Sequence, residues 1–297
     1  MRSSDLGKSV EELVGLFGYS RQHYYKQLRG LEKQRSLEQQ IIDFVVDKRE
    51  SQKRIGTQKL QHLWNQQEGY PRIGRDRLYD LLRRHHLLIR KRKRYRPKLT
   101  DGNGNSIYKD LRKDLEVNRP NQLWCSDITY IDLNNKHRHS YLICFTDEYS
   151  HLIVGYHVSY HMKTEGVLQA LSNAIEAQMD QSQGCFDQPL IIHTDRGSQF
   201  KSAKYIEKTD RYGIQRSMTR AGKSYENPVA ERLNGILKNE LMRTTKFQTI
   251  EQARKEIDRA IQVYNEQRPH LSCDMLTPVQ AHQTNGPLKK RWRQRKP

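Results

Sequence analysis

The chain is organised around the stretch Asn227-Pro228-Val229-Ala230-Glu231-Arg232-Leu233-Asn234-Gly235-Ile236-Leu237-Lys238. Asn227 is a favourable helix N-cap, Pro228 suits the first helical position, and the apolar side chains fall on one stripe, formed by Leu233, Ile236 and Leu237. The stretch is therefore expected to be a helix. Glu231 and Lys238 lie seven positions apart, so they project from roughly the same face, about two turns from each other.

Two aspartates precede this helix, each on an apolar run that reads as a strand. Asp127 stands within Trp124–Asp132, and Asp195 directly follows the short apolar strand Pro189–Thr194. Thirty-five residues separate Asp195 from Glu231, and sixty-seven separate Asp127 from Asp195. If the two strands pair side by side, the fold brings three carboxylates to one point.

Three carboxylates without a cysteine or a histidine cluster are hard oxygen ligands, which favour Mg²⁺ or Mn²⁺ over zinc. Two such ions about 3.5 to 4 Å apart can activate an attacking oxygen and stabilise the leaving oxygen of a phosphodiester. Asp127 is expected to bridge the ions, while Asp195 and Glu231 each complete one of them. His193 shares the strand face of Asp195, and it is interpreted either as a group that tunes this site or as a packed core histidine.

Charge is the strongest compositional signal in the 297 residues. Lysine and arginine number 53 against 34 acidic residues, a net charge of +19, which points to a polyanionic partner. Residues 1–120 hold 28 basic and 15 acidic side chains, and the last nine residues add six basic ones, whereas residues 121–288 hold 19 of each sign. A neutral middle between basic ends suggests a catalytic body carried by nucleic-acid-binding arms, and a merely soluble basic surface is the alternative.

Cysteine usage and hydropathy exclude several classes of protein. The four cysteines have no close spacing and read as reduced core thiols, without a disulfide framework or a zinc site. No apolar run approaches the length of a membrane span, and the first residues are polar. A cytoplasmic protein is therefore expected, and the family resemblance described below implies that it is bacterial and associated with the nucleoid.

Residues 1–32 read as two short helices joined by a glycine turn. Ser9 can cap the first, Gly18 ends it, and Ser20 can cap a second that runs through Leu28. The pattern resembles a helix-turn-helix, although two helices around a glycine also occur in any small bundle. In the DNA-binding interpretation, the second helix is led by Arg21, Gln22 and His23.

Residues 33–98 read as a helical DNA-binding segment that ends in a basic tract. Helical spacing recurs in Leu37–Val45, from Thr57 onward and in Arg75–His86. Four outward-facing cations of the last helix are expected to contact DNA: Arg75, Arg77, Arg83 and Arg84. The tract that follows would be neutralised along a phosphate backbone, through Arg90, Lys91, Arg92, Lys93 and Arg94. A solvated basic linker is the alternative for this tract.

After a linker at residues 99–120, the apolar period changes to that of strands. Three consecutive strands are predicted over 124–133, 139–147 and 152–159, then a helix over 164–178, a strand over 189–194, a helix over 202–212 and a strand over 214–218. With the Glu231 helix and a helix over 250–265, residues 121–283 form an α/β domain. Residues 284–297 form a basic tail.

The sequence around the three carboxylates resembles that of a known family. Four stretches carry the resemblance: Trp124 to Ile131, His193 to Phe200, Asn227 to Lys238, and Tyr264 to His270. With the DD(35)E spacing, they resemble the second reading-frame product of insertion sequences of the IS-three group, in the DDE or retroviral integrase superfamily. The resemblance covers most of the chain. No cysteine precedes Cys125, so the zinc-binding arm of viral integrases is absent.

The resemblance implies an RNase H-like core, with a mixed five-stranded sheet and flanking helices, preceded by small all-α DNA-binding segments. It also implies a catalytic triad of Asp127, Asp195 and Glu231, two Mg²⁺ or Mn²⁺ ions, and Lys238 as a basic group along the DNA. The expected activity is transposition: cleavage at the terminal inverted repeats and transfer of a 3′-hydroxyl to a phosphodiester of double-stranded target DNA.

Two other functions stay open from the sequence. One is a DNA-binding regulator of transposition that is inactive without a fused or partner subunit, and the other is an RNase H-type nuclease that uses water alone. Joining two ends implies a homodimer or a larger assembly on DNA, and the upstream reading-frame product is a further candidate partner. The repeat sequence and the target preference cannot be read from the chain.

Overall fold

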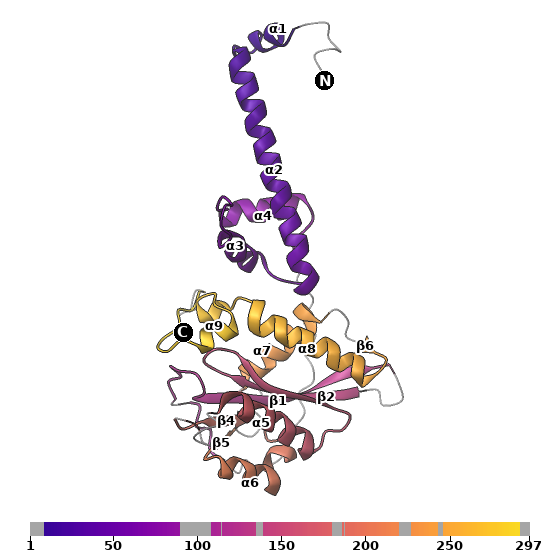
Figure 1. Cartoon of the computed structure of the whole chain (residues 1–297), viewed down its shortest axis with the longest axis vertical. Helices are drawn as coiled ribbons and strands as arrows, with labels where there is room; N and C mark the ends of the chain where they lie inside the picture. The colour runs from indigo at the N-terminus through magenta and orange to yellow at the C-terminus, as the bar shows by residue number, and fades with distance from the viewer. Residues whose placement is uncertain are drawn as a thin grey trace. The chain divides into compact units, whose positions relative to one another are not determined.

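The computed structural model describes residues 9–89, 108–113, 115–134, 139–179, 186, 188–219, 227–242 and 246–291. The chain divides into two compact units (Figure 1). The first is helical and holds the described residues up to 50 together with 56–89, and the second holds 51–55 and the described residues from 108 onward.

The first unit consists of α1 (Val10–Gly15), α2 (Arg21–Ser51, whose last residue belongs to the second unit), α3 (Thr57–Asn65) and α4 (Arg75–Arg84). The expected caps are confirmed. Ser9 and Glu12 form a capping box at α1, and the Ser20 hydroxyl accepts a hydrogen bond from the His23 amide, 3.1 Å away, at the start of α2.

The prediction that the second helix ends near Leu28 is wrong, because α2 continues without a break to Ser51. The polar stretch between Leu31 and Leu37 contains residues of high helix propensity and no proline, so it continues the helix. Gly30, just before it, costs only about 1 kcal/mol relative to alanine. The expected boundary between residues 32 and 33 therefore falls inside one helix.

Only the second half of α2 contributes to the core of this unit. Ile41 and Val45 are the buried residues of α2, whereas the described side chains of residues 21–36 are all exposed. Apart from Val14 of α1, the other buried apolar side chains of the unit come from its α3 to α4 part and include Leu60, Trp64, Leu78, Leu81 and Leu82.

The second unit is built on a mixed sheet of strand order β3-β2-β1-β4-β5. The strands are β1 (Leu123–Leu133), β2 (His139–Asp147), β3 (Ile153–Ser159), β4 (Ile191–Thr194) and β5 (Gln215–Met218). β1 pairs antiparallel with β2, which pairs antiparallel with β3, and β1, β4 and β5 run parallel. All five strands were predicted, and their arrangement is that of an RNase H-like core. A two-residue strand that was not predicted, β6 (Lys246–Phe247), pairs with β1.

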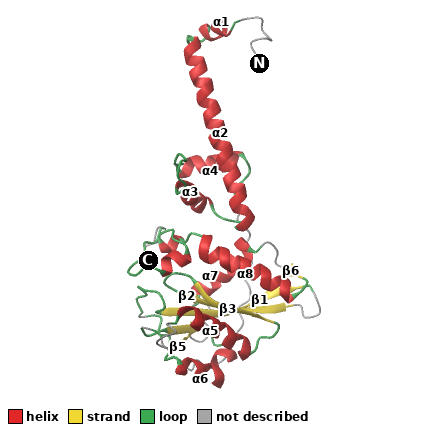
Figure 2. Ribbon diagram, viewed as in Figure 1, coloured by secondary structure: helices red, strands yellow, loops and turns green. Residues whose placement is uncertain are grey.

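Helices cover both faces of this sheet (Figure 2). Helices α5 (Thr164–Gln178) and α6 (Ala203–Arg211) pack on one face, in a core that includes Trp124, Phe145 and Leu171. On the other face lie α7 (Pro228–Ile236), its π-helical continuation η4 (Leu237–Leu241) and α8 (Ile250–Gln267). After α8, the chain forms a 3-10 turn, η5 (Leu271–Cys273), and a short last helix, α9 (Pro278–His282). Another 3-10 turn, η2 (Ser198–Lys201), lies between β4 and α6.

Helix α5 approaches β3 so closely that only glycine fits at the contact. A Cβ atom at Gly155 would lie 2.5 Å from the backbone nitrogen of Ala174. Because the nitrogen of Ala174 belongs to the backbone of α5, it cannot move away by a change of rotamer, as a flexible side chain could. Gly155 therefore sets the distance between the helix and the sheet.

We expect Gly155→Ala to lower the free energy of unfolding by about 3 kcal/mol, because the whole of α5 must shift to accept one methyl group. Gly235→Ala is the matched control: a Cβ there meets nothing within 4 Å. In a helix interior this change should stabilise by roughly 0.5–1 kcal/mol. Urea unfolding of both variants measures the two effects, and equal stabilities would contradict the close contact.

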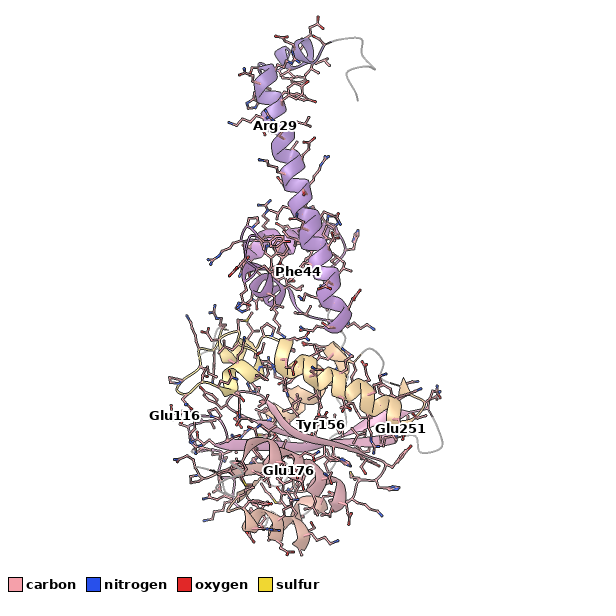
Figure 3. All side chains as sticks on the ribbon, viewed as in Figure 1. Arg29, Phe44, Glu116, Tyr156, Glu176 and Glu251 are labelled. Carbon is pink, nitrogen blue, oxygen red and sulfur yellow. The ribbon has the colours of Figure 1, made fainter. Side chains whose placement is uncertain are left out.

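The stretch Tyr264 to His270 joins α8 to the neighbouring elements. The side chain of Asn265 forms two hydrogen bonds with the backbone of Ile153, at 3.0 and 3.1 Å, and so closes the start of the edge strand β3. Arg268, 3% exposed, donates from Nε to the Glu240 carboxylate at 2.8 Å. Further along the same edge, the hydroxyl of Tyr156, labelled in Figure 3, donates to Asp258 at 2.8 Å.

Arg268→Ala is expected to cost about 3 kcal/mol of stability, because it leaves the half-buried Glu240 carboxylate without its buried partner. Lys255→Ala, an exposed change on the same helix, should stay within about 0.5 kcal/mol of the wild type. Urea unfolding compares the two variants. A loss below 1 kcal/mol for Arg268→Ala would mean that the pair behaves like a surface ion pair.

Three cysteines of the described chain, Cys125, Cys144 and Cys273, are buried free thiols, in agreement with the sequence. Cys185 lies outside the described residues. Among the described helices, none combines the length and the apolar character that crossing a bilayer requires.

Candidate active site

The sheet places the two predicted aspartates level with each other on neighbouring strands. Cys125 of β1 is paired in parallel with His193 of β4, and each aspartate follows two residues later, as Asp127 and Asp195. The prediction that the aspartates lie on adjacent central strands is confirmed. Asp127 lies within β1, whereas Asp195 stands just past the end of β4.

The third carboxylate comes from α7, which packs across β1. Glu231 lies in the first turn of this helix and is exposed. One turn further on, Asn234 donates from Nδ2 to Asp127 Oδ2 at 2.9 Å. Lys238, in η4, donates from Nζ to the hydroxyl of Thr129 at 2.7 Å. The polar face of this helix therefore lies along β1 at the aspartate.

A glycine turn holds the carboxylate of Asp195. The Gly197 amide donates to Asp195 Oδ1 at 2.9 Å. A Cβ atom at Gly197 would lie 3.0 Å from that same oxygen and 2.9 Å from Gln199 Oε1, so a larger residue would crowd the carboxylate. This accounts for the glycine in Asp195-Arg196-Gly197.

Asp127 lies where it senses the charges of both other carboxylates. Burial raises the pKa of Asp127 to about 7, and the negative charges of Asp195 and Glu231 raise it as well, against the lowering effects of the Ile128 amide and of Lys238. Burial also raises the pKa of Asp195, against the Gly197 amide. The pKa of Lys238 is lowered, chiefly by burial. Negative charge is thus concentrated where the strands β1 and β4 meet α7.

The carboxylates of Asp127, Asp195 and Glu231 suit a hard divalent cation such as Mg²⁺, which binds oxygen ligands. Its positive charge would also offset the repulsion among the carboxylates. Within the described ranges, no group of three or more histidine, cysteine, aspartate or glutamate side chains is arranged to hold one ion. The residues therefore fit the metal by their chemistry, and their side chains must draw together around it.

Two more residues lie near the three carboxylates, and the structure gives each a definite place. His193 is fully buried, and its Nδ1 lies 2.8 Å from Ser217 Oγ and 3.8 Å from Asp110 Oδ1, so it is packed in the core. Asn234, which contacts Asp127 directly, was not singled out from the sequence. Its position three residues after Glu231, on the same helix face, is the signal that could have identified it.

The basic residues expected to bind DNA are only partly described. Arg21 is exposed at the start of α2, with its guanidinium 5.8 Å from the ring centre of Tyr25. Arg75 pairs with Asp76, Arg83 with Asp80 and Arg84 with Glu38, while Arg77 is exposed. The five cations of the basic tract lie outside the described residues: Arg90, Lys91, Arg92, Lys93 and Arg94.

Parts of the second unit are similar to known protein families and to solved structures. Two family models described as "Integrase core domain" match residues 117–224 and 212–278, which hold all three carboxylates. Among solved structures, the catalytic core domain of HTLV-2 integrase in complex with magnesium is similar, with a TM-score of 0.41 and 21% identity over 55% of this chain and 97% of that domain.

The protein relatives are products of insertion sequences. A putative transposase for IS986/IS6110 of Mycobacterium tuberculosis is 36% identical over 163 residues, which are 54% of this chain and 57% of that protein, so the match spans little more than half of its length. The transposase for IS904 of Lactococcus lactis is 31% identical over 202 residues, which are 67% of this chain and 77% of that protein. The chain therefore belongs to the insertion-sequence transposases of the DDE and retroviral integrase superfamily.

Proposed function

We propose that this protein is a DNA transposase that cleaves the ends of its insertion sequence and transfers the freed 3′-hydroxyl to a phosphodiester of target DNA. One observation carries the proposal. Asp127, Asp195 and Glu231 come from two strands and a helix, and the charges of the latter two raise the pKa of Asp127. A carboxylate cluster of this kind, on the integrase core of a transposase family, supports phosphodiester chemistry.

In the proposed mechanism, Asp127, Asp195 and Glu231 hold two Mg²⁺ or Mn²⁺ ions. When bound, these ions would activate the attacking oxygen and stabilise the leaving oxygen of the phosphodiester. Asp127, which feels the charge of both other carboxylates, is proposed as the shared ligand. Asn234 orients its carboxylate through the hydrogen bond to Oδ2.

The thiol that pairs across the sheet with Asp127 is not an available nucleophile. Cys144 faces Asp127 across the β1–β2 pair. Burial and the neighbouring Asp127 charge raise the pKa of the Cys144 thiol, so it remains protonated and unreactive. The attacking group is therefore proposed to be external: water in cleavage and the DNA 3′-hydroxyl in joining.

Double-stranded DNA is the proposed partner, through the terminal repeats and the target site. The excess of basic residues over acidic ones falls at the two ends of the sequence, which suits attachment to phosphates on both sides of a neutral core. Lys238 lies beside Thr129 on the strand of Asp127, where we propose that it contacts the DNA backbone. Two ends imply at least two copies on the DNA, and the upstream reading-frame product is a further proposed partner.

We expect Asp127→Asn, Asp195→Asn and Glu231→Gln each to abolish cleavage and joining while leaving DNA affinity within about twofold, because each removes a charge on the metal and not a phosphate contact. The assay uses the full chain with Mg²⁺ and labelled DNA that carries the element's terminal repeat. Glu207→Gln, an exposed change on α6, is the control and should join ends normally.

Other outcomes of this assay identify the rival functions. Joining that survives in any of the three variants would reject the triad. Wild-type protein that binds the repeat but never cuts it, even with Mn²⁺, would indicate a regulator that needs a partner subunit. Hydrolysis of the ends without a joined product would indicate a nuclease.

A further inference from the structure

Asn227 stands at the N-terminal end of α7, but its side chain does not cap the helix. An asparagine at this position ordinarily accepts a hydrogen bond from an amide of the first turn. Asn227 instead donates from Nδ2 to the backbone carbonyl of Ser126 in β1, at 2.9 Å. The residue is 4% exposed, and its Oδ1 has no hydrogen-bond partner among the described atoms. The side chain of Asn227 therefore bonds to the distant strand β1 and does not cap its own helix.

This contact links two of the proposed catalytic carboxylates by a short path. Ser126 directly precedes Asp127 in the chain. The backbone carbonyl of Asn227 accepts a hydrogen bond from the amide of Glu231, at 3.2 Å. Asn227 is thus bonded through its side chain to the strand of one carboxylate and through its backbone to the helical turn of the other.

Two further contacts extend the same face of the helix. Asn227, Glu231, Asn234 and Lys238 follow one another at spacings of four, three and four residues, which is the repeat of one helical face. On either side of Glu231, this face is bonded to β1: Asn227 to Ser126, Asn234 to Asp127 and Lys238 to Thr129. The three partners lie within four residues of one strand.

Apolar packing alone would not hold this geometry. Leu233, Ile236 and Leu237 bury the opposite side of the helix in the core, but such contacts are non-directional and permit small slides and rotations. Glu231 and Asp127 carry like charges and therefore repel each other. Directional hydrogen bonds from neutral amides can oppose that repulsion without adding charge.

We propose that Asn227 is a positioning residue that holds the helical turn of Glu231 at a fixed place along the strand of Asp127, so that only the carboxylate side chains have to move when they close around the metal ions. The inference rests on the proposed function. Asn227 touches neither substrate nor metal in this role, and it acts through the strand and the helix that it joins.

Asn227→Ser tests the proposal most sharply. Serine is as good an N-cap as asparagine, but its shorter side chain cannot span the distance to Ser126, so the variant keeps the helix start and removes only the tether. Asn227→Ala also removes the tether but supplies no side-chain cap, and Asn239→Ala is the control, because Asn239 is exposed and bonds within its own helix. Circular dichroism and urea unfolding of the full chain establish that each variant is folded.

The decisive readout is metal binding, measured from the shift of the melting temperature with added Mg²⁺ or Mn²⁺. For Asn227→Ser and Asn227→Ala, we expect the midpoint concentration to rise about 10-fold, the usual effect of removing a group that orients a metal ligand. The strand-transfer rate at saturating DNA should fall by a similar factor, with DNA affinity unchanged. Raising Mn²⁺ should restore transfer in Asn227→Ser but not in Glu231→Gln.

A folded Asn227→Ser with the metal midpoint of the wild type would overturn the positioning role, whatever its activity. Recovery in Asn227→Ser but not in Asn227→Ala would assign Asn227 to ordinary helix capping. The proposed function fails separately, if wild-type protein joins no ends or if Glu231→Gln binds metal as the wild type does.

Discussion

The parallel pairing of β4 beside β1 is the constraint on which the site depends. It sets Asp195 level with Asp127 across one strand spacing, and thereby places two carboxylates where a buried environment penalises their charge. Everything that packs around them must tolerate or balance this repulsion. The neighbouring groups do so with amides, as at Gly197 and Asn234, and with the half-buried ammonium of Lys238.

Helix α7 meets two demands with its two sides. Its apolar stripe enters the core shared with α8 and the sheet, which supplies the burial energy for docking. Its polar face carries Glu231 between two asparagines and a lysine, each bonded to β1. Burial attaches the helix, and hydrogen bonds fix its register along the strand.

Sequence patterns were sufficient for most elements of the second unit. Alternation of apolar residues identified β1 to β3, and helical spacing identified α5 and α8, because one face of each is buried. The same patterns failed in two places. The long α2 was divided, since its first half buries no face and shows no period, and β6 was missed because two residues carry no period at all.

Residue types and spacing by themselves determined the three carboxylates, the helix of Glu231 and the basic ends of the chain, because charge and periodicity are local properties of a sequence. Only the tertiary structure decided how these parts meet. It placed His193 in the core against Ser217 and Asp110, where the sequence had left two interpretations open. It also revealed Asn227 bound to Ser126, 101 positions earlier. A hydrogen bond between such distant residues leaves no spacing signal, so it becomes visible only when the folded chain brings its donor and acceptor together.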